Sequence, residues 1–246
     1  MKLRRPAGKL RQPPATPPPG SGRTPRGGPD RFPGFDVLAG QRHWDPATAA
    51  VLAERLGPQP DLRFFTPAEE AIATALLDLL LGQQNPDPRT VLGARNADQQ
   101  RDRPRIPLTA MIDSRLAAAE TDGWRYANMP EDGQAWRDTL GFLDADAQAK
   151  HGRGFAGCPA ADQAALIQVV QDTGAGDWHG YPASRVWSLW TRYACTAFYA
   201  HPWAWNEMGF PGPAYPRGYK NIGVGKREPF EVPDARPAQD PVREDG

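Results

Sequence analysis

The sequence predicts an all-α fold, with one helical domain that has long loops and lies between two disordered tails. Apolar residues recur at helical spacing in six segments; two of these begin with capping residues and four are followed by glycines. No segment shows the sustained apolar–polar alternation of a half-buried strand. We therefore expect a helical domain over 35–231, a basic Pro/Gly-rich tail over 1–34 and a polar tail over 232–246.

The composition limits the classes of function. The 246 residues include 28 prolines and 25 glycines, and the formal net charge is zero, which gives no support to nucleic-acid binding. The longest apolar run, 71–81, is shorter than the ~20 residues of a membrane span, so no direct membrane span is expected. The two cysteines, Cys158 and Cys195, fit a reducing compartment or an oxidising one with a single disulfide, and Cys158 could also pair across subunits.

The first two helices have clear starting signals. Asp45 and Pro46 form an N-cap and a proline at the first helical position, and this helix is expected to end at Gly57. Thr66 and Glu69 form a capping box at the start of the second helix. The apolar positions of the two helices are Ala49, Leu52 and Leu56, and then Ile72, Leu76, Leu79 and Leu80, with a stop at Gly82.

The other four helices are expected from apolar spacing, and three of them also from the residues that stop them. The third follows a polar stretch over 83–105. Their core positions and stops are Leu108, Met111, Ile112 and Leu116; Trp136, Leu140, Leu143 and Ala147, before Gly152; Leu166, Ile167, Val169 and Val170, before Gly174; and Val186, Trp190, Tyr193 and Ala197, before His201 and Pro202.

The sixth helix lacks the charged side chains of an ordinary solvated face. Its core face is expected at Val186, Trp190, Tyr193 and Ala197, at about 100° per residue. The opposite face has Arg192 as its only charged residue, and its other members are Ser188, Thr191, Cys195 and Tyr199, flanked by Trp187 and Phe198. Three interpretations are open: burial on all sides within its own domain, a second packing surface for another subunit, or a ligand site.

Residues 201–220, which we call the aromatic strap, place five aromatic rings among prolines and glycines. The strap is too irregular for a helix and too rich in proline for a central strand. The rings are Trp203, Trp205, Phe210, Tyr215 and Tyr219. They could pack on the chain's own core, bind a ligand or bind another protein, and large aromatic side chains on a proline-stiffened backbone favour the last.

No catalytic site is expected, because the nucleotide-binding, hydrolase, metalloprotease and haem-attachment motifs are missing from the sequence. The alternative function is a stand-alone helical enzyme or cofactor protein with a site between the sixth helix and the strap. Its candidate polar groups are His179, Cys195, His201 and Arg217.

The other titratable residues have ordinary structural explanations. No histidine follows a glutamate by three residues, as a di-iron bundle would need. The histidines His43, His151, His179 and His201 are interpreted as capping, loop or surface residues. Glu69 with Glu70, and Asp144 with Asp146, are assigned to helix starts or exposed faces.

Several short motifs follow one another in an order that is typical of one family. They are RFFTPAE at 63–69, MIDSRL at 111–116, DGWRY at 122–126, AWR at 135–137, YAHP at 199–202, WNEMGF at 205–210 and GPAYPRGY at 212–219. In this order they resemble the gluconate 2-dehydrogenase subunit 3 family over about Phe32 to Glu231. The GPAYPRGY motif is the most specific of them.

The resemblance implies a partner rather than a reaction. Members of this family are small subunits without flavin; FAD and the alcohol oxidation belong to a large subunit of the glucose–methanol–choline oxidoreductase type, and some complexes add a c-type cytochrome. The resemblance therefore implies a non-catalytic subunit that binds, stabilises and helps assemble a FAD-dependent alcohol or sugar dehydrogenase, with no catalytic, metal or cofactor-binding residue in this chain. From the chemistry of the strap and of the sixth helix, we expect the partner interface at Trp203, Trp205, Phe210, Pro213, Tyr215, Arg217, Tyr219, Cys195 and Tyr199.

The resemblance also implies a periplasmic complex of a bacterium, which family members often reach with a twin-arginine signal. Arg4 and Arg5 are followed by prolines and charged residues instead of the apolar segment that such a signal needs. Three alternatives therefore stand: a cytoplasmic protein, export by the partner's signal, or a misassigned start codon.

Overall fold

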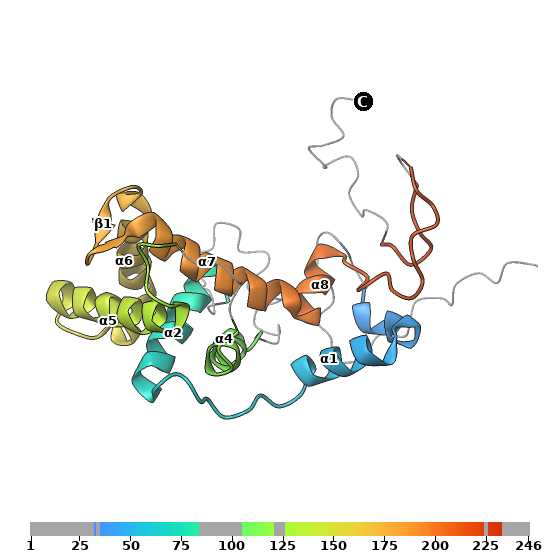
Figure 1. Ribbon diagram of the computed structural model, residues 1–246, viewed down its shortest axis with the longest axis horizontal. Helices are drawn as coiled ribbons and strands as arrows, with labels where there is room; N and C mark the ends of the chain where they lie inside the picture. The colour runs from blue at the N-terminus through green and yellow to red at the C-terminus, as the bar shows by residue number, and fades with distance from the viewer. Residues whose placement is uncertain (1–31, 33–34, 84–104, 121–125, 224–225, 233–246) are drawn as a thin grey trace, which may run out of the picture.

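The fold is all-α, as the sequence predicts. The computed structural model in Figure 1 describes residue 32 and residues 35–83, 105–120, 126–223 and 226–232. Its helices are η1 (Val37–His43), α1 (Pro46–Leu56), α2 (Pro67–Leu80), α4 (Leu108–Ala117), α5 (Asp132–His151), η2 (Phe155–Gly157), α6 (Ala160–Thr173), α7 (Ala183–Ala200) and α8 (Pro202–Met208). The described strands β1 (Asp177–Trp178) and β2 (Tyr181–Pro182) form one small antiparallel hairpin. The six predicted helices are α1, α2, α4, α5, α6 and α7.

The predicted helix ends are confirmed where local chemistry determines them. The Asp45 carboxylate accepts hydrogen bonds from the backbone N–H groups of Ala47 and Thr48 at 3.0 and 3.1 Å, which caps α1. Both hydrogen bonds of the capping box between Thr66 and Glu69 are present at the start of α2. Short-range signals of this kind are readable without knowledge of the tertiary structure.

The prediction that the aromatic strap contains no helix was wrong, because Pro202–Met208 forms α8. Pro202 occupies the first helical turn, where the missing N–H costs nothing, and the His201 side chain accepts the N–H of Trp203 as an N-cap. Gly209, with φ of 67°, ends the helix in the left-handed region. The seven residues between these signals are enough for two turns.

The main hydrophobic core lies among α2, α4, α5, α6 and α7. Its largest fully buried side chains include Trp136, Trp190, Tyr193 and Phe155. The predicted core face of α7 is confirmed, because Val186, Trp190, Tyr193 and Ala197 are all buried.

A buried carboxylate fixes the linker between α1 and α2 to this core. Asp113 of α4, 1 % exposed, accepts the backbone N–H groups of Arg63, Phe64 and Phe65 at 2.8, 2.9 and 2.7 Å. Three N–H groups that would otherwise lack partners are thereby satisfied by one side chain. The linker consequently has a defined position beside α4.

A second, smaller core joins η1, α1 and α8. Its buried members are Val37, Trp44, Leu52 and Trp205, and Phe210 packs against it. In Figure 1, α7 runs from the group formed by α2, α5 and α6 to the group formed by η1, α1 and α8. The chain therefore has two packed groups of helices, with α7 extending between them.

Some predictions fall outside the described residues. Phe32 is the one residue of the predicted N-terminal tail that is described, and it is 8 % exposed. The described residues do not include 1–31, 33–34, 84–104, 233–246 or most of the DGWRY motif. No helix within the described ranges is long and apolar enough to span a lipid bilayer.

Candidate functional site

The first half of the aromatic strap packs within the chain. Trp205 is 6 % exposed, and its indole Nε1 donates to the backbone oxygen of Tyr199 over 2.6 Å. The ring of Phe210 meets Trp205 edge-on with centroids 5.1 Å apart. Trp203 is partly buried against the main core. These three rings, predicted as partner contacts, thus pack to a large extent on other residues of their own chain.

His201 connects the end of α1 to the junction of α7 and α8. Its Nε2 donates to the backbone oxygen of Arg55 at 3.0 Å, and its Nδ1 accepts the N–H of Trp203 at 3.3 Å. In the other direction, the guanidinium of Arg55 donates a hydrogen bond to the backbone oxygen of Ala200 at 2.7 Å. Burial lowers the pKa of His201 to about 4, so the imidazole is neutral with its proton on Nε2, as both hydrogen bonds require.

The second half of the strap, continued to residue 223, is a loop with exposed apolar side chains. We call residues 213–223 the exposed loop. Tyr215, Tyr219 and Ile222 keep 69 %, 53 % and 82 % of their surface exposed. Single exposed apolar residues are common, but three of this size within eight positions mark a surface available for contact.

The exposed loop is held by interactions at its base. The carboxylate of Glu228, a residue 4 % exposed, accepts the backbone N–H groups of Lys220 and Asn221. The guanidinium of Arg217 lies over the ring of Phe230 at 3.8 Å and donates to the Pro213 oxygen at 3.2 Å. Arg217 and Pro213 therefore support the loop from inside, whereas the two tyrosines point their surface outward.

The outer face of α7 is open to solvent near the helix end. Cys195, Thr196 and Tyr199 are exposed, and Tyr199 keeps 50 % of its surface. The interpretation that this helix is buried on all sides was therefore wrong. Trp187 and Phe198, at the sides of this face, pack against the main core.

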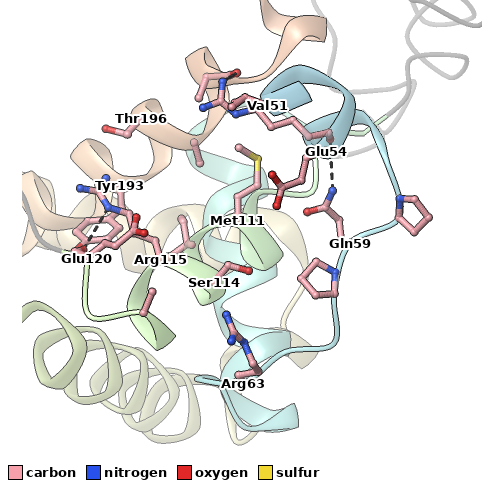
Figure 2. Close-up of a pocket in the computed structure, with 17 residues that line it drawn as sticks. Val51, Glu54, Gln59, Arg63, Met111, Ser114, Arg115, Glu120, Tyr193 and Thr196 are labelled. Carbon is pink, nitrogen blue, oxygen red and sulfur yellow. Dashed lines mark hydrogen bonds between the residues drawn. The ribbon is translucent and has the colours of Figure 1, made fainter. Parts of the chain in front are cut away.

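A cleft of about 780 Å³ lies between α1, the linker 57–65, α4 and α7. Figure 2 shows Met111 and Ser114 of α4 in its middle, with Glu54 near one end and Arg63 at the other. Arg115 is engaged at the side, because its Nε donates to the Glu120 oxygen at 3.3 Å and its guanidinium lies 5.1 Å from the Tyr193 ring.

The structure does not assemble the polar groups of the alternative cofactor site. His179 lies beside the start of α7, where it contacts Asp146 at 2.7 Å and stacks on Phe142 at 4.6 Å. His201 follows the other end of α7, roughly 25 Å away by helix rise. Within the described ranges, no cluster of three or more His, Cys, Asp or Glu is placed to hold a metal ion. Cys158 is buried and Cys195 exposed, both as free thiols.

Asp144 and Asp146 have tertiary partners, so their assignment to helix starts or exposed faces was wrong. Both lie within α5 and are partly buried. Asp144 accepts the backbone N–H of Phe155 at 2.8 Å, and Asp146 accepts the indole N–H of Trp178 at 2.9 Å. Glu69, in contrast, is the predicted capping residue of α2, and it also binds Arg137.

Sequence reasoning missed Glu228, Ile222 and the cleft. Glu228 reads as one more acidic residue near the C-terminus, because nothing local shows that its partners are backbone groups seven and eight residues earlier. The cleft is lined from three separated segments of the chain. The sequence feature nearest to the cleft was the lack of charged residues on one face of α7, and this face lies next to the cleft.

The helices and the single small hairpin define a small all-α protein. A family model, gluconate 2-dehydrogenase subunit 3, matches residues 47–212, more than half of the sequence, and the chain belongs to this family. The match confirms the resemblance and covers a shorter range than the motifs suggested, ending just before the exposed loop. Comparisons with curated proteins and with solved structures gave no match. By its name, the family is a subunit of a dehydrogenase.

Proposed function

We propose that the chain is a non-catalytic small subunit that binds, stabilises and helps assemble a FAD-dependent alcohol or sugar dehydrogenase. In this proposal the FAD and the reacting groups belong to a large flavoprotein subunit of the glucose–methanol–choline type, and a c-type cytochrome can complete the complex. Family membership supports the role of a dehydrogenase subunit. The observation that carries the binding role is the exposed loop, with its three outward apolar side chains.

The exposed loop has the properties of a docking element. Large aromatic side chains contribute a disproportionate share of binding energy at protein interfaces. The hydrogen bonds from Lys220 and Asn221 to Glu228 hold the loop before binding, which lowers the entropy lost on docking. Tyr215, Tyr219 and Ile222 are therefore the primary contacts that we propose.

The outer face of α7 is the second part of the proposed interface. Cys195 and Tyr199 are exposed there without a described element covering them. Trp203, Trp205, Phe210, Pro213 and Arg217 belong to the same interface in this proposal, mainly as the support on which the exposed groups stand. Alkylation of Cys195 should accordingly be fast in the free chain and slow in the complex.

The test is mild affinity purification of the full chain from its native host, with mass spectrometry and a visible absorbance spectrum. We expect a stoichiometric flavoprotein, and we expect its yield to fall at least tenfold with Tyr215→Ala plus Tyr219→Ala. Val169→Ala on α6 is the matched control, because Val169 is 48 % exposed and lies outside the strap. A wild-type chain recovered alone, or a double variant that retains the flavoprotein fully, contradicts the proposal.

A further inference from the structure

We propose that the cleft between α1, α4 and α7 is a docking groove for one extended segment of the large subunit. The segment would carry an acidic side chain at one end and a basic side chain a few residues away. This inference rests on the proposed function and adds a second contact, built from residues other than those of the exposed loop.

The charges at the two ends of the cleft define the chemistry of the occupant. Glu54 and Arg63 are both exposed cleft residues. In the described part of the chain, neither forms an ion pair or a side-chain hydrogen bond, although Arg55 next to Glu54 is bound to the Ala200 oxygen. Figure 2 shows the Arg63 guanidinium directed toward Ser114, at the opposite end from Glu54. A segment with complementary charges would pair with both ends in one orientation only.

Apolar side chains form part of the surface between these charges. Met111 is partly buried on the cleft wall, and Ile112 and Ala197 are buried beneath it. The Ser114 hydroxyl beside them can donate to a carboxylate that approaches Arg63. Apolar contact along the middle with polar groups at the ends is the pattern of a groove that holds a peptide chain.

The shape of the cleft favours a chain segment over a small molecule. Its volume, about 780 Å³, is within the range of binding cavities, about 300–1,000 Å³. Small-molecule sites, however, bury most of the ligand, and this cleft is open along its rim: Val51 is 44 % exposed, and Pro58 and Pro60 are exposed as well. An open groove leaves the ends of a continuing chain free to leave it.

The position of the occupant is tested by photo-crosslinking in the intact complex. Val51, on the rim of the cleft, and Val169, on α6, are replaced one at a time by p-benzoylphenylalanine in the full chain; the two valines have similar exposure, 44 % and 48 %. We expect the probe at position 51 to label one flavoprotein peptide that contains both an acidic and a basic residue, and the probe at position 169 to label none.

A charge variant tests the orientation. Arg63→Gln should weaken the affinity for the purified flavoprotein about fivefold, whereas Arg63→Lys should retain most of it, because a charge pair at an interface edge has a modest energy. If the complex forms but the probe at position 51 labels only this chain or nothing, the groove is refuted while the proposed function stands. If the wild-type chain recovers no flavoprotein, both are refuted.

Discussion

The indole of Trp190 on α7 donates a hydrogen bond to the hydroxyl of Thr139 on α5, with 3.1 Å between Nε1 and Oγ1. Both residues have no exposed surface. The same hydroxyl donates to the backbone oxygen of Ala135 at 2.7 Å, so one threonine satisfies a buried indole without leaving its own proton unpaired. This bond specifies the position of α7 against α5.

Thr139→Val should lower the free energy of unfolding by about 1–3 kcal/mol, because valine keeps the shape but leaves the Trp190 N–H buried without an acceptor. Thr139→Ser keeps the acceptor and should cost about 1 kcal/mol for the lost methyl group. Urea unfolding followed by tryptophan fluorescence measures both. A serine variant less stable than the valine variant would contradict the role of the hydrogen bond.

Asp113→Asn should lower the free energy of unfolding by about 2–3 kcal/mol, because the three linker N–H groups lose a charged acceptor and meet an amide NH2 group. Asp61→Asn, on the exposed surface of the same linker, is the control and should change stability by less than about 0.5 kcal/mol. Equal effects of the two substitutions would show that Asp113 does not hold the linker.

Stability should fall as the pH is lowered from about 6.5 to about 4, because the buried His201, with a pKa of about 4, resists a proton that the unfolded chain accepts at its ordinary pKa of 6.5. The contribution of this group is complete above pH 6.5 and amounts to at most about 3 kcal/mol. His201→Asn can still cap α8 but does not titrate. Its stability should therefore depend less steeply on pH in this window than that of the wild type, and parallel curves would exclude the effect.

Gly212→Ala should destabilise the chain by about 3 kcal/mol, because its φ of 83° is strained for alanine and the added Cβ would lie 2.9 Å from Nε1 of Trp44. Gly218 also has a positive φ, 69°, but a Cβ there meets nothing within 4 Å. Gly218→Ala should cost about 1 kcal/mol for backbone strain alone. Thermal unfolding compares the two, and similar melting temperatures would argue against close packing on Trp44.

The sequence predicts what depends on neighbouring residues. The caps at Asp45 and Thr66 and the helix stop at Gly152 involve groups within four residues, so their chemistry can be read directly. The α-helical periodicity likewise identifies the buried face of α7, since burial there follows from spacing alone.

What the sequence could not provide are contacts between distant segments. His201 meets a backbone oxygen 146 positions earlier, and its burial among such distant segments lowers its pKa and keeps its ring neutral. The rings of the strap look equivalent in the sequence, yet Trp205 is buried and Tyr215 is exposed. That difference arises because α8 turns the first half of the strap onto η1 and α1, and no local pattern encodes which ring faces them.

The length of α7 determines the rotation about its axis that relates the two packed groups of helices. One residue inserted just before Ala197 would rotate everything beyond it by about 100° and shift it by about 1.5 Å. Since α8 follows directly, such an insertion would redirect the exposed loop, and it would also move Ala197 and Ala200 relative to the cleft wall formed by α4. The two proposed contacts would lose their common geometry together. The number of residues in α7 therefore determines how the exposed loop and the cleft are oriented relative to each other.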